Sequence, residues 1–297
     1  MVICIDSINV DFVKSIFKKA DSFIENPTNI PSHNDKILCN MFFEPSTRTM
    51  LSFESAMYKL NGKVINFKND ISSIKKGESI KDTLKTLEHY ADIFVIRHPS
   101  SKIIFDANTY MNKPVINAGN GDSEHPTQAL IDTFTIHKFF NFLNTPIYKK
   151  IKLLFIGDIK HSRTIHSLYK LLHSFFFHIF DIRFINYHNC YDDNLMNEDN
   201  TETNFDNIHT FDVIYCTRVQ KERFVSYSSI NYDDEIKRLQ INSTILNNIK
   251  KNAIILHPLP RNNEIDILID DDIRCKFFDQ VKYGVFVRMA IIDAAFS

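Results

Sequence analysis

Hydroxyl groups and a guanidinium gather at the start of one predicted helix, in the sequence Phe43-Glu44-Pro45-Ser46-Thr47-Arg48-Thr49. A helix start exposes unpaired N–H groups and a partial positive charge, which favour an anion. Because no glutamate or glutamine stands at Thr49 to complete a capping box, no side-chain carboxylate is expected to occupy this end. The segment therefore predicts a phosphate site made of hydroxyl groups and a guanidinium. A helix capped by Ser46 is the alternative interpretation of this segment alone.

Further polar residues follow two expected strands in the same half of the sequence. Arg97 ends the first strand, and the run His125-Pro126-Thr127-Gln128 opens a helix after the second. Pro126 suits the first turn of a helix, which puts His125 at its mouth and Gln128 within its first turn. The helix dipole disfavours a protonated imidazole there, so we expect a neutral His125 that can donate a hydrogen bond. A helix-capping role is the alternative for His125 considered alone.

In the second half, three runs that could do chemistry follow strands, at residues 157–164, 217–223 and 257–261. The first contains a single glycine instead of GxGxxG, which excludes a dinucleotide-binding loop there. The second is rich in charge, and a solvated charge run is its alternative interpretation. In the third, Pro258 and Pro260 remove two N–H donors, so carbonyl oxygens that could accept bonds from a substrate amide would dominate. A rigid turn is the alternative for this third run.

Composition excludes several classes of protein. The 297 residues include 35 basic and 36 acidic side chains, for a net charge of -1, which argues against nucleic-acid or membrane-surface binding. A small anionic substrate is still compatible with this net charge, because a few cations that converge on one site have little effect on the charge of the whole chain. The five cysteines are scattered without a CxxC pair, which argues against a zinc ribbon or a disulfide framework and favours a reducing compartment. No apolar run approaches the roughly 20 residues of a membrane span, so we expect a cytoplasmic protein.

Short apolar runs alternate along the chain with segments of helical period, which predicts parallel sheets covered on both faces by helices. The expected strands are residues 37–43, 93–96, 115–116, 152–156, 182–185, 213–216 and 253–256, and the expected helices are residues 46–60, 126–142, 164–177 and about 285–295. The pattern restarts near residues 141–146. We therefore predict an α/β fold of two doubly wound domains with mainly parallel sheets and an active site in the cleft between them.

The predicted domains are residues 1–140 and residues 141–284, with the C-terminal helix, about residues 285–297, packing back onto the first. Within the second domain, residues 186–209 are rich in Asn and Asp and poor in apolar side chains. This composition predicts a mobile surface loop.

Together these segments resemble the catalytic chains of aspartate carbamoyltransferase, within the carbamoyltransferase family. The resemblance spans nearly the whole chain and rests on residues 43–53, 75–83, 97–99, 125–132, 157–168, 217–223 and 257–261, which stand in the expected order. The last two segments point to the aspartate branch, because ornithine enzymes typically have His-Cys-Leu-Pro where Pro258 stands here. The resemblance implies that carbamoyl phosphate and L-aspartate react to N-carbamoyl-L-aspartate and phosphate, an early step of pyrimidine (UMP) biosynthesis, without cofactor or metal.

The resemblance also implies a role for individual residues. The first domain would bind carbamoyl phosphate and the second L-aspartate. The catalytic residues would be Arg48, Thr49, Arg97 and His125. Carbamoyl phosphate would be bound by Ser46, Thr47, Arg48, Thr49, Arg97, His125 and Gln128, and by the carbonyl oxygens of Leu259 and Pro260. L-Aspartate would be bound by Lys76, Arg163, Arg218 and Gln220.

Ser72 and Lys76 resemble the residues of a loop that reaches into the neighbouring subunit's site, which implies a homotrimer with shared active sites. A regulatory chain is a further partner that the resemblance leaves open. Two residues depart from the family's pattern near the site. Ser162 stands where glycine is common, and Asn120 stands where aspartate is common.

Two other functions stay open from the sequence. One is a carbamoyltransferase for another amine such as ornithine, although Arg163 and Arg218 favour a dicarboxylate. The other is a catalytically silent homologue that serves as a binding subunit, which the presence of every candidate ligand disfavours. A dehydrogenase with a glycine-rich nucleotide loop is excluded, because the whole chain holds only 6 glycines.

Overall fold

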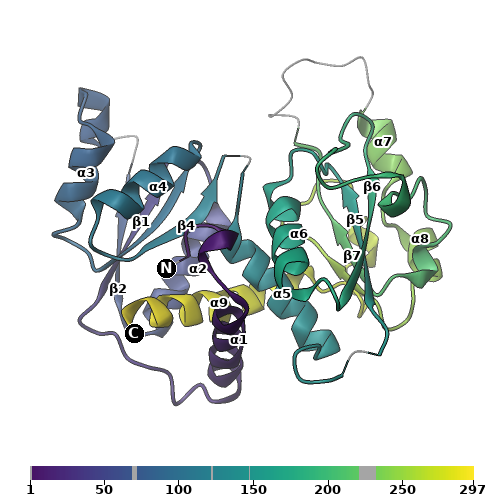
Figure 1. Cartoon of the computed structure of the whole chain (residues 1–297), viewed down its shortest axis with the longest axis horizontal. Coiled ribbons are helices and arrows are strands. Elements are labelled where there is room, and N and C mark those ends of the chain that lie inside the picture. Colours follow the sequence, from purple (N-terminus) through teal and green to yellow (C-terminus); the bar gives the residue numbers. More distant parts are fainter. Residues whose placement is uncertain (1, 69–71, 122, 147, 221–231) are drawn as a thin grey trace. The chain divides into compact units, whose positions relative to one another are not determined.

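The computed structural model describes residues 2–68, 72–121, 123–146, 148–220 and 232–297 (Figure 1). The chain divides into two compact units, residues 1–134 together with 282–297, and residues 135–281. We call them the first unit and the second unit. The chain crosses between them inside two helices, α5 (Pro126–Phe140) and α9 (Phe277–Phe296).

The first unit contains a parallel sheet of four strands in the order β2-β1-β3-β4. Its strands are β1 (Ile37–Phe42), β2 (Lys63–Phe67), β3 (Ile93–His98) and β4 (Val115–Asn120). Residues in the middle of β1, β3 and β4 are buried, as expected where both faces of a parallel sheet are covered, and these strands were predicted from their apolar runs. The edge strand β2 was missed, because three of its residues are exposed and interrupt any apolar run.

Four helices of the first unit accompany this sheet, namely α1 (Val10–Glu25), α2 (Thr47–Lys59), α3 (Ile80–Leu87) and α4 (Ser101–Tyr110). Of these, only α2 was predicted. Side-chain caps define where α1 and α3 begin. Asn9 accepts from the N–H of Phe12 at 2.8 Å, and Ser79 accepts from the N–H of Asp82 at 3.0 Å. The apolar face of α1 then buries Ile16 and Phe17 in the core.

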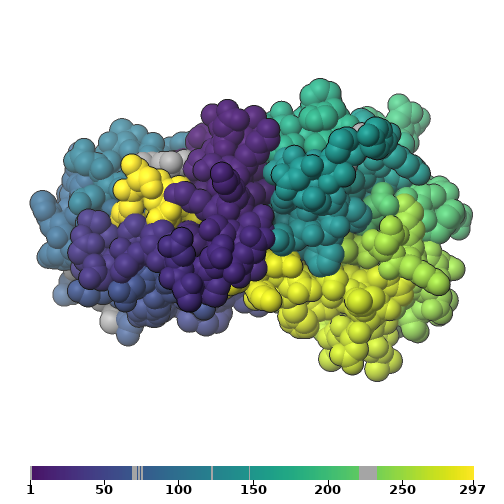
Figure 2. Space-filling model, turned by 90° about the horizontal axis from the view of Figure 1, so that it is seen from below, coloured from purple at the N-terminus to yellow at the C-terminus, as the bar shows by residue number. Residues whose placement is uncertain are grey.

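The C-terminal part of α9 is anchored in the first unit by polar contacts. Asp293 accepts from Lys19 Nζ at 2.5 Å and pairs with His33 Nε2 at 2.9 Å. One turn and a half earlier, Arg288 donates to Ser52 Oγ at 2.8 Å. Figure 2 shows the yellow C-terminal residues lying against the purple N-terminal segment. None of the described helices is both long and apolar enough to cross a membrane.

The second unit repeats the plan with a parallel sheet in the order β6-β5-β7-β8. Its strands are β5 (Ile151–Gly157), β6 (Phe180–Asn186), β7 (Val213–Cys216) and β8 (Ile254–Leu256), and its helices include α6 (Arg163–Phe176), α7 (Tyr232–Arg238) and α8 (Ser243–Asn248). Two parallel sheets of four strands with interleaved helices confirm the predicted α/β, doubly wound fold class. The short helices α7 and α8 were missed, whereas all four strands were predicted.

Both sheets reverse their winding at a central pair of strands. In the first unit the chain moves from β1 outward to β2 and then to β3 on the other side of β1, and in the second it moves from β5 to β6 and then to β7. Ligands of open α/β sheets bind at such switch points, beside the carboxyl ends of the strands. The segments after β1 and β3, and those after β5 and β7, are therefore the places to search for a site.

The Asn- and Asp-rich residues 186–209 form an irregular segment that is partly buried. It contains two short 3-10 helices, η4 (Glu198–Asn200) and η5 (Ile208–Thr210), and buries the side chains of Tyr187 and Cys190 completely. Asn197 and Asn200 cap each other, each accepting a backbone N–H from the other, at 2.8 and 3.1 Å. The prediction of a surface loop thus missed the buried anchors, because Asn serves here as a capping and turn residue.

Candidate active site

The predicted phosphate segment lies at the junction of β1 and α2. Helix α2 begins at Thr47, Thr47 and Arg48 are exposed, and Thr49 is buried in the first turn. Ser46 occupies the N-cap position but makes no side-chain capping hydrogen bond. The capped-helix interpretation is therefore wrong for Ser46. Ser46 Oγ, the usual acceptor for the N–H groups of a first turn, instead accepts from Arg97.

Arg97 lies at the end of β3 and contacts the start of α2 across the switch point. Its Nη1 donates to Ser46 Oγ at 3.0 Å, and its Nε donates to Glu44 Oε2 at 3.2 Å. Its backbone oxygen accepts from the N–H of Phe43 at 2.9 Å. The structure thus brings together a guanidinium, a hydroxyl group and a helix N-terminus, as an oxyanion requires.

The turn after β4 is closed against β3 by a glycine. Gly121 has a φ of +50°, and a Cβ atom there would lie 2.4 Å from the backbone oxygen of Pro99. The N–H of Gly121 donates to the oxygen of His98 at 3.1 Å. Asn120 closes the same turn, because its Oδ1 accepts from the N–H of Glu124 at 3.0 Å. An aspartate carboxylate oxygen at position 120 could accept the same bond.

His125 and Gln128 stand at the start of α5, as predicted. His125 is buried, with Nδ1 3.5 Å from Thr127 Oγ1. Gln128 Nε2 donates to the buried carboxylate of Asp132 at 2.7 Å, which leaves the amide oxygen of Gln128 out of this bond. Burial lowers the pKa of Arg288 to about 10, and the charge of Asp132 opposes that shift. The sequence analysis did not identify Asp132 as the residue that holds Gln128, because nothing in the sequence pattern distinguishes a buried aspartate from one on the surface.

In the second unit, the buried Asp158 ties together the loops that follow β5 and β7. Its Oδ1 accepts from the N–H of His161 at 3.1 Å and lies 2.8 Å from His161 Nδ1, while its Oδ2 accepts from the N–H of Gln220 at 2.9 Å. The side chain of Gln220 donates to the oxygen of His161 at 2.8 Å. The predicted aspartate ligand Gln220 is therefore fixed on both its backbone and its side chain.

The two arginines predicted to bind aspartate follow neighbouring strands of this sheet. Arg163 is the first residue of α6 and is buried, and Ser162 before it caps the helix by accepting from the N–H of Ile165 at 3.4 Å. The serine that departs from the family's glycine thus has a local structural role. Arg218 follows β7, and its Nη1 donates to the oxygen of Val219 at 3.0 Å. Of the predicted 217–223 segment, residues 221–223 lie outside the described residues.

The loop after β8, which carries Leu259 and Pro260, is held by a buried pair that sequence reasoning did not identify. His257 Nε2 lies 2.7 Å from Glu264 Oε1, and His257 Nδ1 accepts from the N–H of Leu259 at 2.8 Å. Since Nδ1 is an acceptor, the imidazole is neutral and its Nε2–H donates to the Glu264 carboxylate. Burial accordingly lowers the pKa of His257.

This pair fixes an unusual backbone at Leu259. Burial alone would raise the pKa of Glu264, but the hydrogen bonds from His257 and from the backbone of Asn262 lower it, so Glu264 stays ionised. Leu259 has a φ of +54°, a region that leucine rarely adopts. The N–H of Leu259 is held by His257, which stabilises this conformation and so fixes the carbonyl oxygens of Leu259 and Pro260.

The loop predicted to serve a neighbouring subunit precedes α3. Ser72 is half-buried and Lys76 is exposed at the end of the short helix η3 (Ser73–Lys76). Gly77 follows with a φ of +94°, and a Cβ atom there would meet nothing within 4 Å. Lys76 is thus exposed to solvent in the segment before α3.

Gly157 offers a sharp test of the packing between the β5 and β7 loops. Its φ is +129°, and a Cβ atom would lie 2.3 Å from the backbone oxygen of Thr217. We expect Gly157→Ala to lower the free energy of unfolding by about 2–5 kcal/mol, because the costs of backbone strain and overpacking add. Gly77→Ala is the matched control, because Gly77 also has a positive φ but a Cβ atom there meets no neighbour. We expect this variant to lower the free energy of unfolding by only about 1–2 kcal/mol. Thermal unfolding of both variants measures the difference, and an equal midpoint for the two would contradict this account.

Comparisons with known proteins identify the family of the chain. Residues 1–138 match the family model of the aspartate/ornithine carbamoyltransferase carbamoyl-P binding domain, and residues 149–295 match that of the Asp/Orn binding domain. The aspartate carbamoyltransferase catalytic subunit of Thermoplasma volcanium is 38% identical over 308 residues, covering 98% of this chain and 96% of the relative. The multifunctional protein ura1 of Schizosaccharomyces pombe is 40% identical over 272 residues, 86% of this chain, but the match spans 12% of that protein's length.

Solved structures give the same result. The catalytic subunit of M. jannaschii aspartate transcarbamoylase has a TM-score of 0.87 and 36% identity, covering 99% of this chain and 97% of that chain. Aspartate transcarbamoylase of Trypanosoma cruzi, solved in complex with carbamoyl phosphate, has a TM-score of 0.86 and 33% identity, covering 98% and 94%. With both domain models matched and such identity over nearly its whole length, the chain belongs to the aspartate/ornithine carbamoyltransferase family.

Proposed function

We propose that this chain is an aspartate carbamoyltransferase, which transfers the carbamoyl group of carbamoyl phosphate to the amino group of L-aspartate in pyrimidine biosynthesis. One observation carries the proposal. Arg97 and Ser46 hold each other at the start of α2, which has no side-chain cap, beside the switch point between β1 and β3. The related T. cruzi protein, solved with carbamoyl phosphate and aspartate, supports both substrates.

Carbamoyl phosphate is assigned chiefly to the first unit, with two carbonyl oxygens from the second unit. Ser46, Thr47, Arg48 and Thr49 bind its phosphate through hydroxyl groups, the guanidinium and the helix N-terminus, with Arg97 beside them. Thr49, Arg97 and His125 donate to the carbonyl oxygen, on which negative charge develops. Gln128, oriented by Asp132, accepts from the carbamoyl amide, as do the carbonyl oxygens of Leu259 and Pro260.

L-Aspartate is assigned to the second unit, together with Lys76. Arg163 and Arg218 each offer a planar fork that matches a carboxylate, and two such forks fit a dicarboxylate better than the ammonium side chain of ornithine. Gln220 is held in place by Asp158 and His161, so it can add a directed hydrogen bond.

The reaction requires the two bound substrates to meet. The neutral amine of aspartate attacks the carbonyl carbon, so that a C–N bond forms while the C–O bond to phosphate breaks and its electron pair leaves on the phosphate. The extra proton of the amine passes to the departing phosphate or to water. Each preorganised donor to the developing charges contributes about 10²–10³-fold in rate. Because the phosphate already activates the carbonyl, this chemistry needs no covalent nucleophile, metal or redox cofactor.

The bisubstrate analogue N-phosphonacetyl-L-aspartate tests this assignment. It joins a phosphonate to an aspartate, so it should engage the residues of both substrates. We expect saturable binding by calorimetry and a higher unfolding midpoint when the analogue is added. Inhibition that is competitive with carbamoyl phosphate is expected in the assay. Absence of binding at millimolar analogue would overturn the proposed function.

We further propose that the active form is a homotrimer, in which Ser72 and Lys76 of one subunit complete the site of the next. The support is the exposure of Lys76 in the loop before α3, and the open space around Gly77. A lysine so placed can bring its charge to a carboxylate of aspartate bound in another subunit.

Mixing two inactive variants tests the shared site. Arg48→Ala removes a phosphate ligand, and Lys76→Ala removes the residue that would cross between subunits. If sites are shared, a mixed trimer contains sites with both defects and sites with neither, so we expect activity to return to a sizeable fraction of wild type after subunit exchange. A steady-state assay before and after exchange measures it. No recovery, with exchange shown by mass-tagged subunits, would contradict the shared site.

We place the protein in the cytoplasm, where thiols stay reduced. All five cysteines are free, and Cys39, Cys190 and Cys216 are buried. Their burial without pairing is typical of a protein that folds in a reducing compartment.

A further inference from the structure

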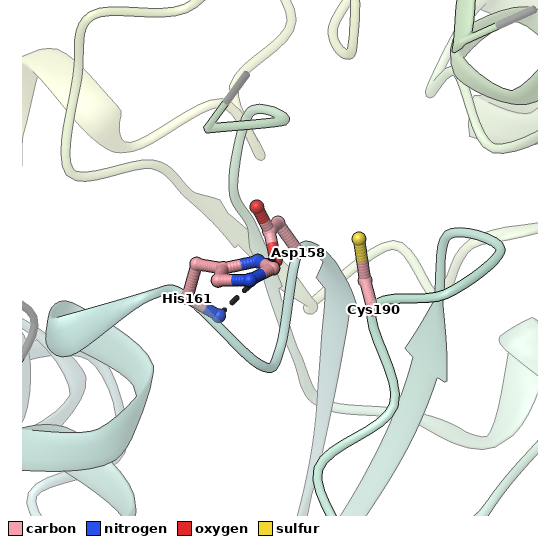
Figure 3. Close-up of side chains that lie close together, drawn as sticks. All are labelled: Asp158, His161 and Cys190. Carbon is pink, nitrogen blue, oxygen red and sulfur yellow. Dashed lines mark hydrogen bonds and ion pairs between the residues drawn. The ribbon is translucent and has the colours of Figure 1, made fainter. Parts of the chain in front are cut away.

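Three side chains of different chemistry converge in the second unit, apart from the residues assigned to either substrate. They are Asp158, His161 and Cys190, shown in Figure 3. Each residue offers one ligand atom, namely a carboxylate oxygen, an imidazole nitrogen and a sulfur. These three atoms lie within 4.8 Å of one another. Asp158 directly follows β5 and Cys190 lies in the turn after β6, the neighbouring strand of the sheet.

The backbone holds these three residues in place. The N–H of Lys160 donates to the oxygen of Cys190 at 3.1 Å, which ties the loop after β5 to the turn after β6. The N–H of Cys190 donates to the oxygen of Tyr187 at 3.0 Å. His161 Nδ1 is already 2.8 Å from Asp158 Oδ1. The cluster is therefore preorganised by contacts that do not involve the sulfur.

The three ligand atoms are near enough to share one ion after the side chains adjust. Zinc–ligand bonds of about 2.0–2.3 Å place neighbouring ligand atoms roughly 3.3–3.7 Å apart, so atoms that now lie up to 4.8 Å apart must approach by about 1 Å. A set of one sulfur, one imidazole and one carboxylate favours a borderline-soft ion such as Zn²⁺ over Mg²⁺ or Ca²⁺, which prefer oxygen alone. Asp158 and Cys190 are buried, while the side chain of His161 is 18% exposed and gives solvent access to the cluster.

We propose that Asp158, His161 and Cys190 form a binding site for Zn²⁺ or a similar divalent ion, with three protein ligands and a fourth position open to water. Burial raises the pKa of the Cys190 thiol, so the sulfur carries its proton until the ion replaces it. Binding forms a metal–sulfur bond and releases that proton to the solvent. Three ligands with an open fourth position are typical of exchangeable metal, in contrast to the closed sets of structural zinc.

Occupancy of the site would also affect the neighbouring loop, an effect that rests on the proposed function. The carboxylate of Asp158 holds the N–H groups of His161 and Gln220 at 3.1 and 2.9 Å. An ion that coordinates this carboxylate competes for the same oxygens and shifts Gln220. We therefore expect Zn²⁺ to inhibit by raising the KM for L-aspartate, with little change in the KM for carbamoyl phosphate.

Cobalt is the probe for the test, because a thiolate–cobalt bond has a charge-transfer absorption in the near ultraviolet that oxygen and nitrogen ligands lack. The full chain, stripped of metal with a chelator, is titrated with Co²⁺. We expect one equivalent to produce this absorption and Zn²⁺ to abolish it by displacement. Cys190→Ser, which keeps a hydroxyl beside Asp158, should lose the absorption, whereas Cys275→Ser, a control in the same unit, should keep it.

His161→Asn provides a second variant that retains the thiolate. It should raise the Kd for Co²⁺ by at least about 10-fold, since even second-shell changes cost that much. Absence of the absorption at saturating Co²⁺, or its persistence in Cys190→Ser, would overturn the metal site. These readouts do not depend on turnover. A wild-type chain that binds cobalt through Cys190 but does not carbamoylate aspartate would therefore contradict the proposed function alone.

Discussion

The Arg97→Ala variant is expected to lose about 10²–10³-fold in kcat/KM for carbamoyl phosphate while it keeps its fold. The side chain of Arg97 is only 12% exposed and is held between Glu44 and Ser46 at the start of α2. A guanidinium fixed in this way meets the charge that develops on the carbonyl oxygen and the phosphate without having to reorganise. Its removal also leaves the Glu44 carboxylate without its cationic partner at the proposed phosphate site, and we expect this to add repulsion. Steady-state kinetics with carbamoyl phosphate as the varied substrate measures the loss.

Two further variants make this prediction specific. Arg97→Lys should recover only part of the activity, because an ammonium cannot reproduce the fork that contacts Glu44 and Ser46 together. Arg183→Ala is the control, since Arg183 pairs with Asp181 at 3.3 Å on the edge strand β6 and is not one of the predicted ligands. A kcat/KM for Arg97→Ala within about threefold of the wild-type value would show that this guanidinium does not act on the reacting atoms.

The second large effect is expected on the other substrate. Arg218→Ala should raise the KM for L-aspartate by about 10²–10³-fold, because a bidentate bond to a carboxylate is worth roughly 3–4 kcal/mol. Arg218 follows β7 two residues before Gln220, whose position is fixed by Asp158. The KM for carbamoyl phosphate, which is assigned chiefly to the first unit, should change little. Initial-rate measurements with each substrate varied in turn separate the two effects.

Arg238→Ala is the matched control for this experiment. Arg238 lies on α7 of the same unit and pairs with Glu235 at 2.9 Å, so its loss removes an equal charge without a predicted substrate contact. If Arg218→Ala and Arg238→Ala raised the KM for aspartate by the same factor, net charge alone would explain the change. Such a result would contradict a direct role for Arg218.

The sequence predicted those parts of the fold that are decided by local patterns. The run Ile93–Ile96 is buried on both faces of the sheet, so its apolar character alone marks a strand. Strand β2 gives no such signal, because its Lys63, Ile65 and Asn66 are exposed at the sheet edge. Recognising an edge strand requires knowledge of which strand pairs with it, and that is a property of the tertiary structure.

In the candidate site, too, the sequence does not reveal features that depend on the tertiary structure. The motif residues Ser46, Arg97, His125 and Gln220 follow strands or begin helices, and this much was predictable from the strand ends. The residues that support them were not, because the carboxylates of Asp132, Asp158 and Glu264 are distinguished only by their burial. A buried carboxylate must be satisfied by hydrogen bonds, and each of these three holds a backbone or side-chain group of the site. Only the folded chain shows which groups those are.

The two sheets share one way of building a site. In each, a loop after one central strand is tied to a loop after its neighbour: Arg97 to Ser46 in the first unit, and Gln220 to Asp158 in the second. Parallel pairing puts these loops at the same sheet edge, and a glycine permits the close approach, as Gly157 does beside Thr217. The scarcity of glycine in this chain is thus compatible with anion binding, since the phosphate is assigned to a helix start with hydroxyl groups and arginines.

The central claim is that the chain transfers a carbamoyl group to aspartate, and a substrate panel tests it most directly. The purified chain is incubated with carbamoyl phosphate and either L-aspartate or L-ornithine, without added metal or cofactor, and the carbamoylated product is quantified. We predict that N-carbamoyl-L-aspartate forms, that ornithine gives no product above background, and that N-phosphonacetyl-L-aspartate stops the reaction. Turnover of ornithine without turnover of aspartate, by a chain that is folded and trimeric, would contradict the account.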